Sequence, residues 1–325
     1  MRKQLRTLGK AVFLQVHTAM LGLGVIVLPK HYYAPVPDIR ELRRTRERWA
    51  RRSDMRGLHV DLDRQLAVLR NMAGRFEPEY RDNAAFRHGT TKGFGPGFGF
   101  IEAQALHGVI RGARPSRIIE VGSGVSTHCM LNAAGLNAAE GSPCSITCIE
   151  PYPSGWLKSA PVALIPRPVQ DVELGAFDEL ASGDLLFIDS THAVRTGGDV
   201  VHIVLNILPR LRPGVIVHFH DIYLPYDFQR DADRSLFQWM ETALLHAYLI
   251  DNARTGILFC LSQLHYDRPE ALREIFPEYR PEPHENGLQT EPPAGRHFPS
   301  SLYLRVAEPA PVGGQAHARE AVAVP

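Results

Sequence analysis

The sequence predicts an α/β fold, in which helices cover both faces of a doubly wound, mostly parallel sheet, with a helical extension at the N-terminus. Three observations support this class. Residues Arg117–Val121 are a short apolar run that ends in a glycine turn, and a helical pattern starts at Val125. Residues 184–189 are a continuous apolar run, as expected of a parallel strand that is buried on both faces. Apolar runs and helical segments alternate along the chain, which is typical of repeated β-α-β units.

The first 30 residues combine a basic start with an apolar run at 11–28. This pattern imitates a signal sequence or a membrane anchor. However, Gln15, His17 and Thr18 interrupt the run, no Ala-x-Ala cleavage site follows, and the length is at the low limit for a spanning helix. We therefore expect a helix that packs on the domain or lies at a membrane surface, while a true anchor and a cleaved signal stay open.

Residues 31–99 are predicted to be a helical and loop cap region. A proline-rich link at 31–38 leads into an arginine-rich segment at 40–56, which we interpret as a solvated helix with internal ion pairs rather than as a patch for an acidic partner. Residues Leu62–Met72 have helical spacing. Residues 88–99 are expected to be a loop, and its Gly/Phe-rich end is either a lid over a substrate or a passive connector.

Residues 100–306 are predicted to be the catalytic domain, and residues 307–325 a disordered tail. A helix at 100–111 precedes the first strand, and strands are expected at 145–150, 162–169, 184–189, 215–220 and 256–264, with an edge strand at 301–306. Helices are expected from Asp199, as N-cap, to about residue 208, and at 235–250, where Ser235 and Gln238 form a capping box. Residues 265–300 contain seven prolines and are expected to be mostly loop.

The glycine turn after residue 121 is the candidate ligand-binding corner. Glycines let the backbone approach a ligand, and free N–H groups at a helix start attract polar or anionic groups. A dinucleotide site prefers Gly-x-Gly-x-x-Gly, but the sixth position here is Thr127. Glu120 precedes the turn, where a carboxylate is unfavourable for a pyrophosphate but suits a cationic ligand or a hydroxyl.

Polar residues also follow the other predicted strands, at the sheet edge where open α/β folds bind ligands. Glu150 ends the second strand, where a carboxylate can accept both ribose hydroxyls of a nucleoside-bearing cofactor. A second cluster follows the fourth and fifth strands: Asp189, His192, His218, His220 and Asp221. We expect His218 to be a core or supporting histidine, whereas a site role for His220 stays open.

Composition limits the remaining classes. Hydrophobic residues make up 44% and charged residues 22% of the 325 residues, which is ordinary for a soluble globular protein. A net charge of +1 gives no indication of a nucleic-acid partner. The four cysteines contain no Cys-x-x-Cys pair, so we expect reduced thiols in a cytoplasmic protein, with membrane association through residues 1–30 left open. The sequence also leaves open a homo-oligomer.

Residues 120–124, Glu-Val-Gly-Ser-Gly, resemble motif I of the class I S-adenosylmethionine-dependent methyltransferases. From about residue 32 to residue 306 the chain is similar to the bacterial group that is related to cephalosporin-hydroxylase-like and small-molecule O-methyltransferases, most specifically at 184–225. The resemblance implies a seven-stranded Rossmann-like sheet with an antiparallel hairpin at one edge. It also implies S-adenosylmethionine as cofactor, with these contacts: Glu120, Gly122, Ser123, Gly124, Thr127 and Glu150. Asp171 would read the adenine amino group or would be only a turn residue.

The stretch 184–225 is also similar in layout to the catechol-type O-methyltransferases. Those enzymes place a metal-binding Asp at the end of the fourth strand, a base three residues later, and an Asp-Asn pair at the end of the fifth strand. The resemblance implies Asp189 as catalytic residue and metal ligand, His192 as base, and His220 and Asp221 as further metal ligands. Here the base is His instead of Lys and the pair is His-Asp instead of Asp-Asn. Two carboxylates with water would suit magnesium, and an added His would favour manganese, iron or zinc.

The predicted function is therefore methyl transfer from S-adenosylmethionine to a hydroxyl of a small molecule or a sugar. A hydroxyl is a poor nucleophile until its proton is removed or a cation stabilises the alkoxide, and an imidazole such as His192 can take a proton near neutral pH. Two alternatives stay open: an NAD-dependent oxidoreductase, and a relative that binds cofactor or glycan without catalysis. Glu120 and the missing third glycine argue against the first, and the set of Asp189, His192 and Asp221 argues against the second.

Overall fold

A computed structural model of the chain describes residues 2–92 and 97–307, with side chains from residue 9 onward. The predicted tail beyond residue 307 and part of the Gly/Phe-rich loop lie outside the described residues. The chain divides into a smaller unit, residues 1–49 with 231–238, and a larger unit, residues 50–230 with 239–325. The domain boundaries expected at 30/31 and 99/100 stay predictions.

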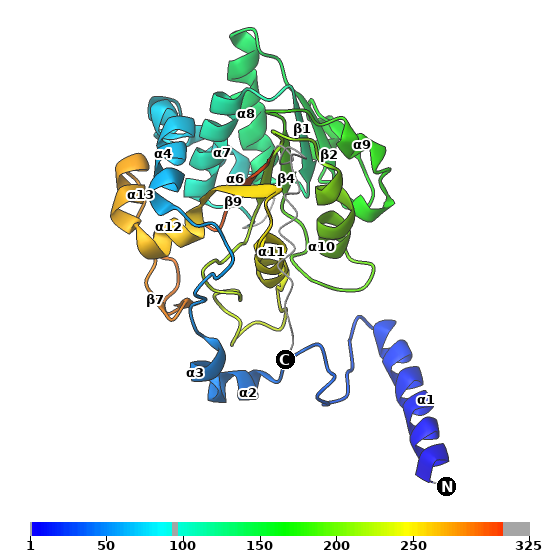
Figure 1. The fold of residues 1–325 in the computed structure, drawn as a ribbon. Coiled ribbons are helices and arrows are strands. Elements are labelled where there is room, and N and C mark those ends of the chain that lie inside the picture. Colours follow the sequence, from blue (N-terminus) through cyan, green and yellow to red (C-terminus); the bar gives the residue numbers. More distant parts are fainter. Residues whose placement is uncertain (1, 93–96, 308–325) are drawn as a thin grey trace, which may run out of the picture. The chain divides into compact units, whose positions relative to one another are not determined.

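The larger unit is built on a seven-stranded sheet with the order β3-β2-β1-β4-β5-β9-β6 (Figure 1). The strands are β1 (Arg117–Val121), β2 (Ser145–Ile149), β3 (Ala163–Ile165), β4 (Leu185–Ile188), β5 (Ile216–Phe219), β6 (Thr255–Cys260) and β9 (Leu302–Val306). Strands β1 to β5 pair in parallel, and β9 runs antiparallel to both β5 and β6. The predicted doubly wound sheet and its antiparallel edge hairpin are confirmed.

Helices cover both faces of this sheet (Figure 1). The longer helices of the larger unit are α4 (Leu62–Met72), α6 (Ala84–Thr90), α7 (Phe100–Ala113), α8 (Val125–Ala139), α11 (Glu241–Leu249), α12 (Leu261–Asp267) and α13 (Pro269–Ile275). Single turns are α5 (Glu77–Tyr80), α9 (Gly175–Asp178) and α10 (Asp199–His202), the last of which continues as a π-helix, Ile203–Ile207. A two-stranded ribbon of β7 (His284–Glu285) and β8 (Leu288–Gln289) completes the unit.

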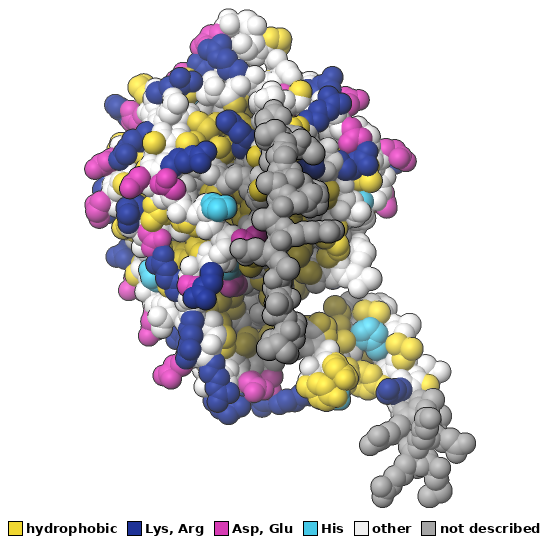
Figure 2. All heavy atoms as spheres, in the orientation of Figure 1, with side chains coloured by type: hydrophobic (Ala, Val, Ile, Leu, Met, Phe, Trp, Pro, Cys, Tyr) yellow, Lys and Arg dark blue, Asp and Glu magenta, His cyan; other side chains and the backbone are white. Residues whose placement is uncertain are grey.

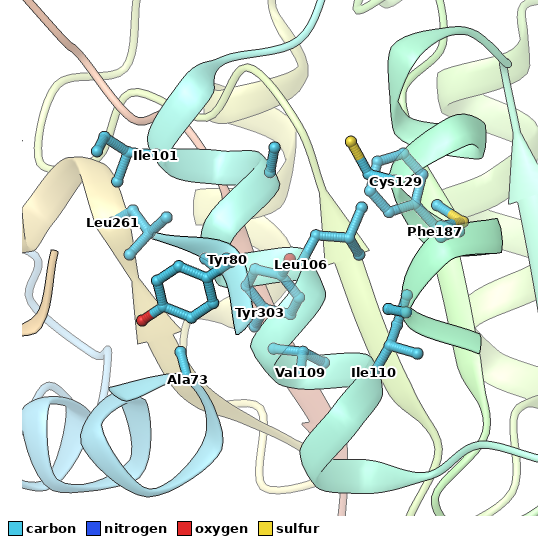
Figure 3. Close-up of a cluster of buried hydrophobic side chains, with 14 of the residues drawn as sticks. Ala73, Tyr80, Ile101, Leu106, Val109, Ile110, Cys129, Phe187, Leu261 and Tyr303 are labelled. Carbon is cyan, nitrogen blue, oxygen red and sulfur yellow. The ribbon is translucent and has the colours of Figure 1, made fainter. Parts of the chain in front are cut away.

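Alternate residues of each central strand face two separate hydrophobic clusters, as the period-two geometry of a strand requires. Ile118 and Phe187 belong to the cluster under α4, α7 and α8, whereas Ile119 and Leu186 belong to the cluster on the opposite face. Figure 3 shows the first cluster, which includes Leu106 of α7 and Tyr303 of β9. Two buried faces therefore fix the sheet and present the strand ends at one edge.

Four expectations about elements are corrected. The helix expected at 235–250 begins only at Glu241, because Gln238 donates to the carbonyls of Ala232 and Ser235 instead of capping a helix. The strand expected to reach residue 264 ends at Cys260, where α12 begins. Helix α6 extends to Thr90, into the expected loop 88–99, whereas residues 265–300 are mostly loop as expected, apart from α13 and short elements. Strand β9 is not an edge strand, since it lies between β5 and β6.

The smaller unit contains α1 (Arg2–Leu21), α2 (Ile39–Arg44) and α3 (Arg46–Trp49). The expected helix across the apolar run ends at Leu21, because the chain turns at Gly24, whose φ is +74°. Ile26 and Leu28 are exposed on the segment that follows. Figure 2 shows hydrophobic side chains on the surface of this smaller unit. No described helix is both long enough and apolar enough to cross a membrane.

Candidate active site

The turn between β1 and α8 brings the backbone of two strands into contact. Gly122 has φ +81°, and a Cβ built on it would lie 1.9 Å from the carbonyl oxygen of Asp189. The N–H of Asp189 donates to the carbonyl of Val121, and the N–H of Gly122 donates to the carbonyl of Ile149. Only glycine fits at position 122, because the ends of β1 and β4 approach each other there.

Glu120 supports this turn from below. Its carboxylate is fully buried and accepts hydrogen bonds from the hydroxyls of Ser126 and Thr127, at 2.7 and 2.6 Å, and from the thiol of Cys148. The hydroxyl of Thr127 in turn accepts the N–H of Gly124. Burial raises the pKa of Glu120 to about 7. These contacts make Glu120 and Thr127 supports of the glycine turn, while a direct contact of either with cofactor stays a prediction.

A cavity of about 140 Å³ opens above the turn. It is lined by residues 97–98 and 122–126, together with Glu150 and Asp189. One carboxylate oxygen of Glu150 lies 3.5 Å from the hydroxyl of Ser123, and the other accepts the N–H of Tyr152. The structure thus brings the expected glycine turn and ribose carboxylate to one cavity, with Asp189 in its wall. Asp171 is exposed on a 3₁₀ turn outside this lining, and its adenine contact stays a prediction.

The second expected cluster assembles at the carboxyl ends of β4 and β5. The Nε2 atom of His192 lies 3.4 Å from Oδ1 of Asp189 and 3.5 Å from Oδ2 of Asp221. The Nδ1 atom of His220 lies at the same two distances from the same two oxygens. Two imidazoles and two carboxylates from distant positions in the chain therefore face one small space.

Two buried glutamates, which sequence reasoning missed, hold the far sides of the imidazoles. Oε2 of Glu241, in the first turn of α11, is 2.8 Å from Nδ1 of His192. Oε1 of Glu102, on α7, is 3.0 Å from Nε2 of His220. Neither residue follows a strand, so the strand-end rule gave no signal for them.

The carboxylates set the electrostatics of this cluster. Burial alone would lower the pKa of His192, but the carboxylates of Asp189 and Glu241 raise it to about 10. In the same way the pKa of His220 is well above its ordinary range because of Asp221 and Glu102, against the effect of burial. The pKa of Asp189 is lowered, since the two imidazoles outweigh its burial. The cluster favours positive charge at its centre, whether from protons or from a cation.

The donor set of this cluster fits a divalent metal ion. Ligand atoms of Asp189, His192 and His220 all lie within 4.8 Å of one another, and oxygen and imidazole donors are those that first-row transition metals accept. Of the expected ligands, Asp189 and His220 belong to this set, together with His192, whereas Asp221 lies outside it although its Oδ2 is 3.5 Å from a nitrogen of each imidazole. His218 is different, because its fully buried ring stacks on Phe187 at 4.0 Å and its Nε2 is 2.8 Å from the hydroxyl of Ser301, as expected of a supporting histidine.

Comparison with known proteins adds the family. A model described as a methyltransferase domain matches residues 119–222, which contain the glycine turn, Glu150 and both strand ends of the cluster. A protein of Archaeoglobus fulgidus described as uncharacterized is 32% identical over 181 residues, which cover 49% of this chain and 75% of that protein. The sheet order and the match to the methyltransferase-domain model agree. The chain belongs to the class I S-adenosylmethionine-dependent methyltransferases.

Two solved structures of low sequence identity are similar to this methyltransferase. One is the Burkholderia thailandensis 1,6-didemethyltoxoflavin-N1-methyltransferase with bound 1,6-didemethyltoxoflavin and S-adenosylhomocysteine, at 15% identity, a TM-score of 0.34, and coverage of 85% of this chain and 93% of that one. The other is the citrinin polyketide synthase CMeT domain, at 15% identity, a TM-score of 0.33, and coverage of 71% and 58%. At these scores the sheet order of the methyltransferase itself remains the observation that defines its fold.

Proposed function

We propose that this methyltransferase transfers a methyl group to a hydroxyl of a small molecule or a sugar. The observation that carries the proposal is the position of Asp189, which lines the cavity above the glycine turn and also belongs to the cluster of imidazoles and carboxylates. A hydroxyl acceptor must be activated by loss of its proton, whereas a neutral amine or a thiolate is already a good nucleophile. Groups that can provide this activation therefore lie next to the cofactor cavity.

The cofactor would be held by residues that already line one cavity. Backbone at 122–124 would approach the ligand closely, and the carboxylate of Glu150 would accept hydrogen bonds from ribose hydroxyls. S-adenosylmethionine supplies an electrophilic methyl group on a sulfonium, which the carboxylates near the cavity would attract. The fully buried Glu120 would act by holding Ser126 and Thr127 in place.

Activation of the acceptor would fall to the cluster at the ends of β4 and β5. Without a metal, neutral His192 would receive the proton of the hydroxyl at Nε2, and Glu241 on Nδ1 would stabilise the imidazolium that results. Because the pKa of His192 is raised to about 10, this base would act at alkaline pH. A bound divalent cation, magnesium or manganese in the simplest case, would instead lower the pKa of the hydroxyl. In both cases Asp189 and Asp221 would orient the group that receives the hydroxyl, which is either His192 or the cation.

Titration calorimetry with S-adenosylhomocysteine tests the cofactor assignment. We expect micromolar binding by the wild-type protein and no binding of NAD. Glu150→Gln should weaken binding by about 10- to 100-fold, because a hydrogen bond to a charged acceptor contributes about 1.5–3 kcal/mol. Glu173→Gln, an exposed glutamate outside the cavity lining, is the matched control and should bind as wild type does. Binding of NAD without S-adenosylhomocysteine would overturn the proposal.

The nature of the acceptor atom is tested with a labelled methyl group. An extract of the source cells is incubated with the enzyme and S-adenosylmethionine that carries a ¹³C-methyl group. The chemical shift of the transferred carbon distinguishes a methyl ether from an N-methyl or C-methyl product. A methyl ether is expected, and a label attached only to nitrogen or carbon would contradict O-methylation.

A further inference from the structure

The spacing of the cluster at the ends of β4 and β5 is unusual for hydrogen bonding. An imidazolium normally approaches one carboxylate to about 2.7–2.9 Å. Here each facing nitrogen stays 3.4–3.5 Å from both carboxylates, so that neither imidazole is closed onto a single partner. Nδ1 of His220 is buried and makes no hydrogen bond of normal geometry with any described residue. Each of these nitrogens therefore lies at nearly equal distances from the two carboxylates.

This spacing matches that of neighbouring ligands on one metal ion. With metal–ligand bonds of about 2.0–2.1 Å, neighbouring donor atoms lie about 2.9 Å apart at right angles and about 3.4 Å apart at tetrahedral angles. The N–O separations of 3.4–3.5 Å lie at the upper end of this range, and Asp189, His192 and His220 each offer a ligand atom within 4.8 Å of the other two.

The far side of each imidazole is held by a carboxylate, as is usual for histidines that bind metals. Glu241 and Glu102 are 1% and 3% exposed, and they lie 2.8 and 3.0 Å from the ring nitrogens that face away from the centre. Glu102 is fixed in turn by the N–H and hydroxyl of Ser300. The hydrogen bond to Glu241 selects the tautomer of His192 that leaves its Nε2 free to donate an electron pair, and Glu102 forms an ion pair with Nε2 of His220.

The backbone also holds two of the four residues in place. His192 and Asp221 have φ of +56° and +54°, in the left-handed region that non-glycine residues seldom adopt. Such conformations persist where surrounding contacts impose them, and they gather at functional sites. The carbonyl of His192 accepts the N–H groups of Met240 and Glu241, and Oδ1 of Asp221 accepts the hydroxyl of Tyr223, which leaves Oδ2 on the side of the two imidazoles.

We propose that Asp189, His192 and His220 bind a first-row transition ion such as zinc, cobalt or iron(II), which would keep a fourth position open for water or the acceptor, with Glu241 and Glu102 as positioning residues. The proposal deepens the proposed function and rests on it for the role of the ion. It changes the expected role of His192 from base to ligand, because its electron pair would be committed to the ion. It also favours a transition ion over magnesium, since two of the three donors are imidazole nitrogens.

The test uses the full chain after treatment with a chelator. Cobalt(II), zinc(II) and magnesium(II) are titrated by calorimetry, and the visible absorption of the cobalt(II) protein reports the coordination number without any mutation. We expect one equivalent of cobalt(II) or zinc(II), the intense absorption of a four-coordinate cobalt(II) ion, and magnesium(II) binding at least about 100-fold weaker. Magnesium(II) binding as tight as that of cobalt(II), or a six-coordinate spectrum, would overturn the proposal.

Variants test the individual residues. Glu241→Gln should lower cobalt(II) affinity by about 10- to 100-fold, as loss of a carboxylate behind a histidine ligand generally does, while Glu173→Gln should not change it. His192→Ala should lower the affinity further and alter the spectrum. A folded His192→Ala protein with the wild-type cobalt(II) affinity and spectrum would return His192 to the role of base. Titration of the same metal-free protein with S-adenosylhomocysteine separates this outcome from failure of the proposed function.

Discussion

Replacement of Gly122 by alanine tests how the cofactor turn and the catalytic cluster depend on each other. The new Cβ would lie 1.9 Å from the carbonyl oxygen and 2.9 Å from the carbonyl carbon of Asp189. Non-bonded contacts of Cβ below 3.0 Å are essentially absent from proteins, so the two backbones must separate by about 1 Å (3.0 minus 1.9). The carbonyl belongs to Asp189 itself, so this separation moves a residue of both the cavity and the cluster.

The expected effect of Gly122→Ala has two parts, one on stability and one on ligand binding. A positive φ at a residue with a side chain costs about 1–2 kcal/mol. Displacement of reacting or binding groups by about 1 Å typically costs about 100-fold in function. We therefore expect Gly122→Ala to lose more than about 2 kcal/mol of unfolding free energy, and to bind S-adenosylhomocysteine about 100-fold more weakly.

Gly141→Ala is the matched control for this experiment. Gly141 has φ +86°, and nothing lies within 4 Å of a Cβ built on it, so alanine there meets the same backbone strain without a clash. Urea unfolding and calorimetric titration with S-adenosylhomocysteine are measured for both variants. Equal stability and equal ligand affinity of the two variants would refute the close approach of the β1 and β4 ends.

Three further predictions concern the buried side chains of Glu120, Arg111 and Leu106. The pKa of Glu120 is raised to about 7 in the folded protein. Between about pH 4.3 and 7 the folded state therefore keeps a proton that the unfolded chain has lost. The free energy of unfolding should fall by about 3 kcal/mol as pH rises through this window. Urea unfolding at pH 5 and pH 8 should show this loss in wild type but not in Glu120→Gln, and parallel pH profiles would contradict it. Arg111→Ala should lower the free energy of unfolding by about 2–4 kcal/mol, because it removes a buried guanidinium and leaves its carboxylate partners unpaired. Arg70→Ala, which removes an exposed ion pair, should lower it by less than about 1 kcal/mol. Leu106→Ala, in the core shown in Figure 3, should lower the free energy of unfolding in urea by about 2–5 kcal/mol. Leu205→Ala, at a side chain that is 62% exposed, should change it by no more than about 0.5 kcal/mol. Equal losses for Arg111→Ala and Arg70→Ala, or for Leu106→Ala and Leu205→Ala, would contradict the burial described here.

Much of the fold follows from local sequence pattern. The bounds of β1 and α4 agree with the apolar run and the helical spacing that predicted them, because each depends on residues close in sequence. The pairing of β9 between β5 and β6 depends on contacts between distant residues, so the alternating pattern at 301–306 could not distinguish an edge from an interior position. The helix at 235–250 failed for the same reason, since the carbonyl of His192 accepts the first N–H groups of α11.

The candidate site divides in a similar way. Strand-end position located Asp189, His192, His220 and Asp221, because parallel strands end at a common edge. The buried partners Glu102 and Glu241 come from helices far away in the sequence, and an acidic residue in a helical segment is usually solvent-exposed. A buried acid within an otherwise apolar segment, as at Glu102, is the signal that could have identified one of them.

The most direct test of the account is the ¹³C spectrum of S-adenosylmethionine with a labelled methyl group, bound to the protein in the presence of cobalt(II). Because Asp189 lines the cofactor cavity and contributes to the metal cluster, the paramagnetic ion should strongly broaden the methyl signal of the bound cofactor. Zinc(II), which is diamagnetic, should leave the signal sharp, and Asp189→Ala should remove the broadening. A cofactor that does not bind, or one that binds with a sharp methyl signal beside a bound cobalt(II) ion, would contradict the arrangement of cofactor and cluster proposed for this methyltransferase.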